Sequence, residues 1–341
     1  MRRKLIITCL FALLGVGVFA QYVPDVLGDD YLSRTIRMPD DYEGEVVCTL
    51  VKKKQLPEVK QAVLYIHGYN DYFFQKQMGD SVNVHGYNFY ALDLRKYGRS
   101  IRPNQDPFFC KSLKEYFADI DTALTIVRSE GNDQIVLMAH STGGLITSYY
   151  LNERKEKVTV DGLVLNSPFL DWNFGWFMEK VMIPVVSFIG DYLPRLTVQG
   201  GGAFSQYAAS LLKQYKGEWN YDVNWKMSYA HPKKAGWIRA IQEAQQVVQK
   251  GLLLECPVLV LSSDRSFPET EEWHPEYRVS DIVLDVSDIQ KYGARLGNHV
   301  TLDTITGGMH DLILSEQESR DRTYAVVFDW LQTICTSPTA Q

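Results

Sequence analysis

Residues 139–143 have the side chains that a serine nucleophile requires around it. They read Ala-His-Ser-Thr-Gly, follow an apolar run at 135–138 and precede a helical pattern. A serine on a tight turn between a strand and a helix presents its hydroxyl clear of the backbone, and its neighbours two positions away must be small. Gly143 meets this requirement, and Ala139 meets it with a methyl group where glycine is more usual. Ser141 is therefore the candidate nucleophile.

Such a nucleophile needs two backbone amides that stabilise the negative charge developing on the attacked carbonyl oxygen. We expect the first from Thr142, which follows the serine at the N-terminus of a helix. The apolar run 62–66 is followed by His-Gly-Tyr at 67–69, so the amide of Tyr69 is the expected second donor. His140 lies beside the serine, but adjacent residues on such a turn point in different directions. We expect it to pack or form hydrogen bonds rather than act as the base.

The general base is expected in a loop near the C-terminal end of the chain. A strand pattern at 300–305 is followed by Thr-Gly-Gly-Met-His, and the glycines allow the imidazole of His310 to reach back. Nucleophile, acid and base follow in that order along chains of this type. The remaining histidines considered are expected to be structural or at the surface: His85, His231, His274 and His299.

Two carboxylates are candidates for the acid that orients the imidazole. Asp264 comes directly after a strand pattern at 257–261, whereas Asp281 comes after a polar and aromatic excursion at 265–280. Either carboxylate would accept the second imidazole N–H, fix its tautomer and stabilise the imidazolium. The residues by themselves leave both alternatives open.

The elements around these residues alternate between strands and helices. Continuous apolar runs predict buried strands at 62–66, 89–92 and 134–138, after two short strands at 35–38 and 46–51. Further strands are predicted at 162–165, 257–261 and 300–305. Apolar residues at helical spacing predict helices at 113–131, 145–151, 233–250, 286–296 and 320–332. The first of these opens with a capping box that starts at Ser112. This alternation predicts an α/β fold with a mostly parallel sheet covered by helices on both faces.

Residues 169–231 interrupt that alternation. The segment is rich in Trp, Phe, Tyr and Gly and has no clear strand for the central sheet. We expect an inserted helical cap over one end of the sheet. The predicted organisation is a first core part at 21–168, the cap at 169–231 and a second core part at 232–341.

The N-terminus predicts export. A basic start at 1–4 precedes an apolar run at 5–20 that ends in Val-Phe-Ala, the layout of a cleaved signal peptide. The alternative is an uncleaved membrane anchor. Beyond the signal, Cys48, Cys110, Cys256 and Cys335 form an even set that permits disulfides, but their irregular spacing favours free thiols.

The charge and the cysteine spacing argue against several classes of partner. The chain has 341 residues, a net charge of −6 and no basic run suited to a phosphate backbone, so nucleic acid is not expected to bind. No short-spaced Cys or His pairs predict a zinc site. The chemistry proposed for Ser141 needs no cofactor and no metal.

Five segments together resemble the monoacylglycerol lipase, lysophospholipase and serine aminopeptidase group of α/β-hydrolases: 64–69, 92–100, 139–144, 281–285 and 308–311. The resemblance implies the α/β-hydrolase fold. In this group the acid opens an Asp-x-x-x-Asp segment that leads into a helix about thirty residues before the histidine. Residues 281–285 fit that form, so the resemblance favours Asp281 over Asp264.

The resemblance also implies a function for the cap. Caps in this group bind an acyl chain, which here assigns substrate contacts to Trp172, Trp176 and Phe177. The expected activity is cleavage of a carboxylic ester in a small, lipid-like, acyl-containing substrate, such as a monoacylglycerol or lysophospholipid. A serine peptidase or amidase is the alternative, and a non-catalytic binding protein is a weaker one. The apolar cap is also a candidate for contact with a membrane surface.

Overall fold

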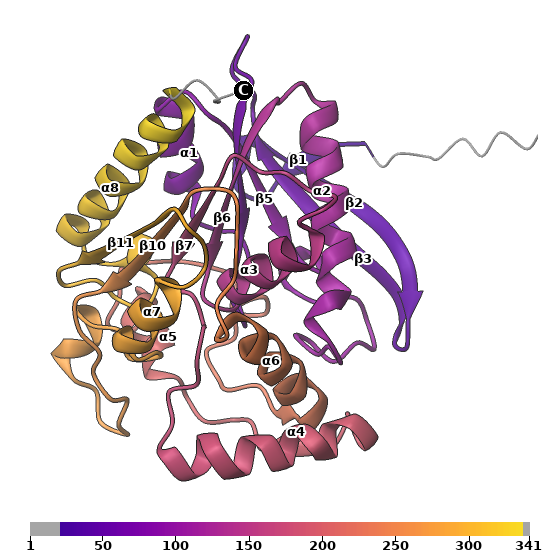
Figure 1. Ribbon diagram of the computed structural model, residues 1–341, viewed down its shortest axis with the longest axis vertical. Helices are drawn as coiled ribbons and strands as arrows, with labels where there is room; N and C mark the ends of the chain where they lie inside the picture. Colours follow the sequence, from indigo (N-terminus) through magenta and orange to yellow (C-terminus); the bar gives the residue numbers. More distant parts are fainter. Residues whose placement is uncertain (1–20, 337–341) are drawn as a thin grey trace, which may run out of the picture.

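A nine-stranded sheet forms the centre of the protein (Figure 1). The computed structural model describes residues 21–336, apart from the side chains of residues 335 and 336. The strands lie in the order β1-β2-β3-β5-β4-β6-β7-β10-β11. Their bounds are β1 Val23–Asp25, β2 Gly28–Asp41, β3 Gly44–Lys53, β4 Gln61–Ile66, β5 Asn88–Asp93, β6 Gln134–His140, β7 Gly162–Asn166, β10 Val258–Ser263 and β11 Val300–Ile305.

The parallel part of the sheet runs from β5 to β11. Its strands β5, β4, β6, β7 and β10 are buried on both faces, whereas the edge strand β11 is largely exposed. Within β4, Leu64 and Ile66 pack into the core on one face, and Val63 and Tyr65 pack into the core on the other. Because both faces are covered, the strand reads as a continuous apolar run rather than an alternating one. The predicted fold class is therefore confirmed.

The antiparallel N-terminal part is longer than the sequence indicated. β2 and β3 pair from Tyr31 opposite Lys53 to Asp41 opposite Gly44, whereas the apolar pattern marked only 35–38 and 46–51. Most side chains of β2 are exposed or half-buried, with Tyr31 and Met38 as its buried positions. Since few of its residues face the core, β2 carries little apolar periodicity that sequence reasoning could use.

Helices cover both faces of the sheet (Figure 1). The core beneath one face includes side chains of α1 and α8, and the core beneath the other includes side chains of α2, α3, α6 and α7. Their bounds are α1 Lys76–Val84, α2 Phe117–Ser129, α3 Thr142–Arg154, α6 Ala235–Val248, α7 Val286–Gly293 and α8 Gln317–Thr336. The capping box of Ser112 and Glu115 is present and opens a 3-10 turn, Leu113–Tyr116, before α2. Further 3-10 turns are Gly98–Ser100, Pro275–Arg278 and Leu312–Leu314.

The segment 169–231 stands between β7 and α6. It contains a π-helical turn at Met178–Met182, α4 (Ile183–Tyr192), a short strand β8 (Thr197–Gln199) and α5 (Gln206–Leu211). β8 pairs with β9 (Lys233–Lys234) in a separate two-stranded sheet, so it adds no strand to the central one. Consequently α6 begins two residues later than predicted, and α4 lies beside it (Figure 1).

Several sequence expectations concern the ends of the chain or the thiols. The predicted signal segment, residues 1–20, lies outside the described residues. Cys48 and Cys110 are buried free thiols and Cys256 is a half-buried one. Within residues 21–336, no helix combines the length and the apolar character needed to cross a bilayer.

Candidate active site

Ser141 lies on a sharp turn between β6 and α3. Its backbone has φ 51° and ψ −119°, a left-handed conformation that a non-glycine residue adopts only under strain. A Cβ atom at Gly143 would stand 2.3 Å from the carbonyl oxygen of His67, so that position requires glycine. The turn holds the Ser141 hydroxyl at the carboxyl ends of the parallel strands.

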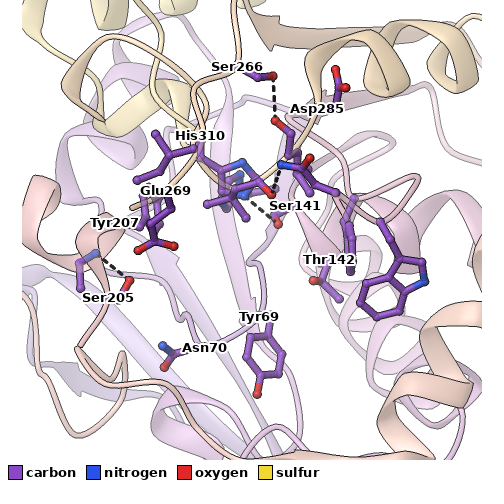
Figure 2. Close-up of a pocket in the computed structure, with 18 of the residues that line it drawn as sticks. Tyr69, Asn70, Ser141, Thr142, Ser205, Tyr207, Ser266, Glu269, Asp285 and His310 are labelled. Carbon is purple, nitrogen blue, oxygen red and sulfur yellow. Dashed lines mark hydrogen bonds between the residues drawn. The ribbon is translucent and has the colours of Figure 1, made fainter. Parts of the chain in front are cut away.

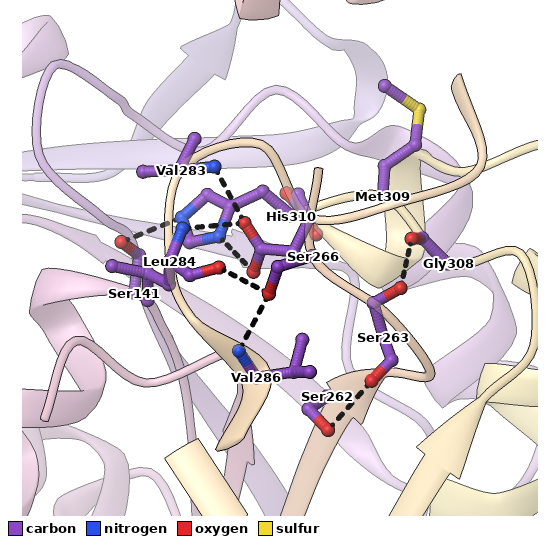
Figure 3. A network of polar contacts seen from close by, with 12 residues as sticks. Ser141, Ser262, Ser263, Ser266, Val283, Leu284, Val286, Gly308, Met309 and His310 are labelled. Atoms are coloured by element: carbon purple, nitrogen blue, oxygen red, sulfur yellow. Dashed lines mark hydrogen bonds and ion pairs between the residues drawn. The ribbon is translucent and has the colours of Figure 1, made fainter. Parts of the chain in front are cut away.

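His310 reaches Ser141 from the loop after β11. Its Nε2 atom lies 3.0 Å from Ser141 Oγ, and its Nδ1 atom lies 2.9 Å from Asp281 Oδ2 (Figure 3). Since a carboxylate only accepts, the Nδ1–H donates to Asp281 and leaves Nε2 free to accept the serine proton. All three side chains are buried. The structure therefore connects the three candidates in one hydrogen-bonded chain.

Asp281 reaches His310 because the excursion before it returns to its starting point. The amide of Asp281 donates to the carbonyl of Arg265 at 3.0 Å, and the amide of Phe267 donates to the carbonyl of Asp281 at 2.9 Å. The residue thus lies just beyond the end of β10 despite the intervening fifteen or so residues. Its Oδ1 atom accepts from the amides of Val283 and Leu284, each at 2.8 Å, which stabilises the ionised carboxylate.

Asp264, the alternative acid, has a different set of partners. Its Oδ1 atom accepts from the amide of Gly307 at 3.0 Å, and its Oδ2 atom lies 3.4 Å from Arg265 Nη2. The carboxylate therefore supports the start of the loop that carries His310 without binding the imidazole itself.

Tyr69 and Thr142, the expected amide donors, both line the cavity that contains Ser141 and His310 (Figure 2). As the first residue of α3, Thr142 has an amide without a partner inside the helix. The neighbouring His67 ties the Tyr69 loop to the sheet, because its Nδ1–H donates to the Gly68 carbonyl at 2.8 Å and its Nε2 accepts from the Leu94 amide at 3.1 Å.

The inserted segment also holds the Tyr69 loop, which the sequence did not indicate. Asn70 donates to the carbonyl of Met227 at 2.8 Å and accepts from the amide of Met227 at 2.7 Å. Lys226 forms a buried ion pair with Asp71 at 2.9 Å. Asn70 has φ 48°, so its backbone is held in a left-handed conformation between these contacts. We name Asn70, Asp71, Lys226 and Met227 the loop clamp.

The cavity above Ser141 has a volume of about 750 Å³, within the usual range for small-molecule sites. Trp172 is part of its wall together with Phe169, Phe174 and Trp237. Trp176 and Phe177 do not line this cavity and are 71% and 60% exposed, which corrects their predicted substrate contact. Their segment is apolar on several faces, so the sequence could not show which face turns inward.

His140, His231 and His85 have structural contacts, and His299 is exposed. His140 is buried and its Nδ1–H donates to the Asn166 carbonyl at 3.0 Å, and burial lowers its pKa. His231 contacts Asp106 at 2.8 Å, and His85 stacks on Phe328.

One group of buried side chains has ligand types suited to a metal ion. Asp71, His140 and Asp311 have potential ligand atoms within 4.8 Å of one another. Lys226 already neutralises Asp71, and Asn166 donates to Asp311 at 2.7 Å. These contacts compensate the acidic groups from within the protein.

The sequence profile of the family described as serine aminopeptidase, S33, matches residues 57–318. The chain belongs to this family. The predicted resemblance is confirmed, and the hydrolase class follows from family membership. No curated protein matches the sequence.

Solved structures with the same fold are distant in sequence. A monoacylglycerol lipase from Paleococcus ferrophilus is 16% identical with a TM-score of 0.57, covering 80% of this chain and 94% of that one. A monoglyceride lipase variant from Saccharomyces cerevisiae, bound to a substrate analogue, is 16% identical with a TM-score of 0.61, covering 88% and 96%. A carboxyl esterase from Bacillus coagulans, bound to glycerol, is 13% identical with a TM-score of 0.60, covering 89% and 98%. At these identities the similarity shows the α/β-hydrolase fold.

Proposed function

We propose that this S33 family member is a serine hydrolase that cleaves carboxylic esters through an acyl-enzyme on Ser141. The observation that carries the proposal is the hydrogen-bonded chain from Ser141 Oγ through His310 to Asp281, at 3.0 and 2.9 Å. A strained serine turn, an imidazole within hydrogen-bond distance of the serine and a buried carboxylate are the parts that nucleophilic acyl transfer requires.

The proposed reaction has two similar halves. His310 takes the proton of Ser141 as the hydroxyl oxygen attacks the ester carbonyl, while the amides of Tyr69 and Thr142 hold the developing oxyanion. His310 then gives that proton to the leaving alcohol, and the acyl group stays on Ser141. Water, deprotonated by His310, attacks the acyl-enzyme and releases the carboxylic acid. Asp281 stabilises the imidazolium in both halves.

An acyl chain is the substrate group that the cavity wall favours. Phe169, Trp172, Phe174 and Trp237 give it aromatic surface close to Ser141. Burial of a methylene group contributes about 0.8 kcal/mol, so each added carbon that fits should raise affinity roughly fourfold. The structural neighbours, which include a monoacylglycerol lipase and a carboxyl esterase, also support an ester of this kind, such as a monoacylglycerol or lysophospholipid.

The test is hydrolysis of 4-nitrophenyl acyl esters of increasing length by the purified protein and by Ser141→Ala. We expect the parent to hydrolyse them and to react with a fluorophosphonate probe, and the variant to do neither. Equal rates for both proteins would refute the assignment of Ser141. A folded parent inactive toward every ester and unreactive with the probe would indicate the non-catalytic alternative.

Peptide cleavage is the second candidate, because the cavity also has acidic groups. The carboxylates of Glu269 and Asp285 line it and could bind the amino group of a peptide. Each already accepts a backbone amide, from Gln206 and Ser287 respectively, at 2.8 Å. Aminoacyl 4-nitroanilides distinguish the two activities, since a higher kcat/KM on these amides than on the acyl esters would favour the peptidase.

We also propose that the inserted segment contacts a lipid surface. The support is a set of exposed apolar side chains on and beside α4: Trp176, Phe177, Val185, Phe188, Tyr192 and Leu193. Co-sedimentation with phosphatidylcholine vesicles tests this, and Trp176→Ser/Phe188→Ser should release the protein. Val84→Ser is the matched control, because Val84 is even more exposed, at 83%, but lies on α1.

Export remains a proposal from the sequence of residues 1–20. When the full sequence is expressed, we expect the mature protein to be found outside the cytoplasm, with a new N-terminus near residue 21. Mass spectrometry of the exported protein measures the mass lost, and an intact N-terminus in the membrane fraction would support the anchor alternative.

A further inference from the structure

Lys233 stands out among the charged residues that line the cavity. Its ammonium group lies 3.9 Å from the ring centre of Tyr69 and 5.4 Å from that of Trp237. Its one hydrogen bond among residues 21–336 goes to the His231 carbonyl at 3.5 Å, and no carboxylate lies within 4.0 Å. The other cavity-lining lysine, Lys226, is paired with Asp71. Lys233 therefore brings an uncompensated positive charge to the cavity.

The position of Lys233 is set by its backbone. The residue belongs to β9, where it pairs with Gln199 of β8, and the helix α6 starts immediately after Lys234. Burial without a counter-charge lowers the pKa of Lys233 to about 8, because the charged form loses hydration. The aromatic faces of Tyr69 and Trp237 compensate part of that loss. An anion in the cavity would supply the missing partner.

We infer that Lys233 binds an anionic group, a carboxylate or a phosphate, that the ester substrate carries. This inference rests on the proposed function and narrows its substrate class to esters with a negative charge near the scissile bond. The Tyr69 ring on which Lys233 lies belongs to the residue proposed to hold the oxyanion, so the anionic group would lie on that side of Ser141.

The acidic side chains of the cavity do not contradict this assignment. Figure 2 shows Asp285 and Tyr69 on opposite sides of Ser141. Glu269 and Asp285 each already accept a backbone amide, and neither forms an ion pair with Lys233. The cavity thus has a cationic group near Tyr69 and the carboxylate of Asp285, at the start of α7, on the other side of Ser141, which would orient an asymmetric, singly charged ester.

The first test compares two esters of equal chain length. Mono-4-nitrophenyl glutarate carries a free carboxylate, whereas 4-nitrophenyl pentanoate is neutral. We expect the wild type to prefer the anionic ester in kcat/KM, and Lys233→Met to reduce that preference about tenfold or more, the usual effect of losing a charge-assisted hydrogen bond. Lys233→Arg should keep the preference. An unchanged preference in Lys233→Met, or none in the wild type, would overturn the inference for the acyl side.

Lys234→Met is the matched control. Lys234 is the next residue, but its ammonium bonds Thr197 at 2.9 Å and does not line the cavity. We expect this variant to keep the anionic preference of the wild type. An equal loss in Lys234→Met and Lys233→Met would show a general effect of charge and would also overturn the inference.

A second test is independent of catalysis and separates carboxylate from phosphate. Calorimetry would measure the binding of hexanoate, hexyl phosphate and neutral 1-hexanol to two proteins, the Ser141→Ala variant and the Ser141→Ala/Lys233→Met double variant. We expect one or both anions to bind more tightly than hexanol. Lys233→Met should weaken the binding of these anions roughly tenfold. The same affinities in both proteins would overturn the inference. If binding depends on Lys233 but the wild type hydrolyses no ester, the proposed function fails and the anion site stands.

Discussion

The loop clamp predicts that Lys226→Met weakens both the fold and the reaction. Lys226 and Asp71 are 6% and 1% exposed, so solvent does not screen their 2.9 Å contact. Among residues 21–336, Asp71 Oδ2 has no hydrogen-bond partner, and Oδ1 would lose its one side-chain donor. Methionine keeps the length of the side chain and leaves a buried carboxylate without its counter-charge.

The size of the effect follows from that burial. Removing one partner of a buried ion pair costs about 3–5 kcal/mol, most of it the penalty for the charge left behind. For a protein of this size each kcal/mol shifts the melting temperature by roughly 2 °C, so we expect a decrease of about 6–10 °C. Asp71 is two residues after Tyr69, so kcat should also fall, by at most the roughly 100–1,000-fold that a lost oxyanion donor costs.

The assay combines thermal unfolding with ester kinetics. We expect Lys226→Met to lower kcat toward 4-nitrophenyl butyrate while KM changes little, because a short ester does not need the loop for binding. Lys226→Met/Asp71→Asn is the control that removes both charges. It should recover most of the stability, since no unpaired charge remains.

The reasoning would be refuted by a melting temperature within about 2 °C of the wild type for Lys226→Met. It would equally be refuted by a double variant no more stable than the single one, because the loss would then not come from the unpaired carboxylate. A stable protein with unchanged kcat would remove the role of the clamp in positioning Tyr69.

Three further predictions concern the acid, the serine turn and pH. Asp281→Asn should lower kcat by about 10³–10⁴-fold in a folded protein, whereas Asp264→Asn should stay within a few-fold in the same ester assay. Gly143→Ala should yield little folded protein in expression trials, because its Cβ would lie 2.3 Å from the His67 carbonyl oxygen, and a soluble active variant would contradict that. Burial raises the pKa of Asp71, but the charge and hydrogen bond of Lys226, together with smaller contributions from His140 and His67, outweigh it, so the pKa is lowered overall. Its stabilising contribution is therefore present above the unfolded value of about 3.9 and is lost as the pH falls through the lower folded value, a loss that acid unfolding curves should show in the wild type but not in Asp71→Asn.

The sequence was most informative where local geometry determines residue type. The turn at Ser141 needs an apolar strand before it, a helix after it and glycine at position 143, and all three are visible in a short window. The loop before His310 likewise shows its glycines directly after a strand. The buried strands were predictable because burial on both faces gives an unbroken apolar run.

Long-range contacts were not predictable from the residues. Asp281 could not be separated from Asp264 by the local pattern, because the deciding contact is the pairing of Asp281 with Arg265 and Phe267 across the excursion. The loop clamp joins residues about 155 positions apart, and nothing near Asn70 indicates a partner at Met227.

Apolar composition alone also failed to place the insertion's aromatic residues. Trp172 faces the cavity, whereas Trp176 and Phe177 face solvent a few residues later. A helix that is apolar all round gives no hydrophobic face from which orientation can be read.

The contact of Met227 and Lys226 with the Tyr69 loop has a consequence for protein engineering. The insertion cannot be exchanged as an independent module, because part of it supports the reaction centre of the core. A chimera that receives the corresponding segment of a distant relative would need these two positions retained to keep turnover, however well the new segment fits a chosen substrate. Specificity in this scaffold is therefore best altered in the part of the insertion before residue 222, because changes there leave the residues of the loop clamp in place.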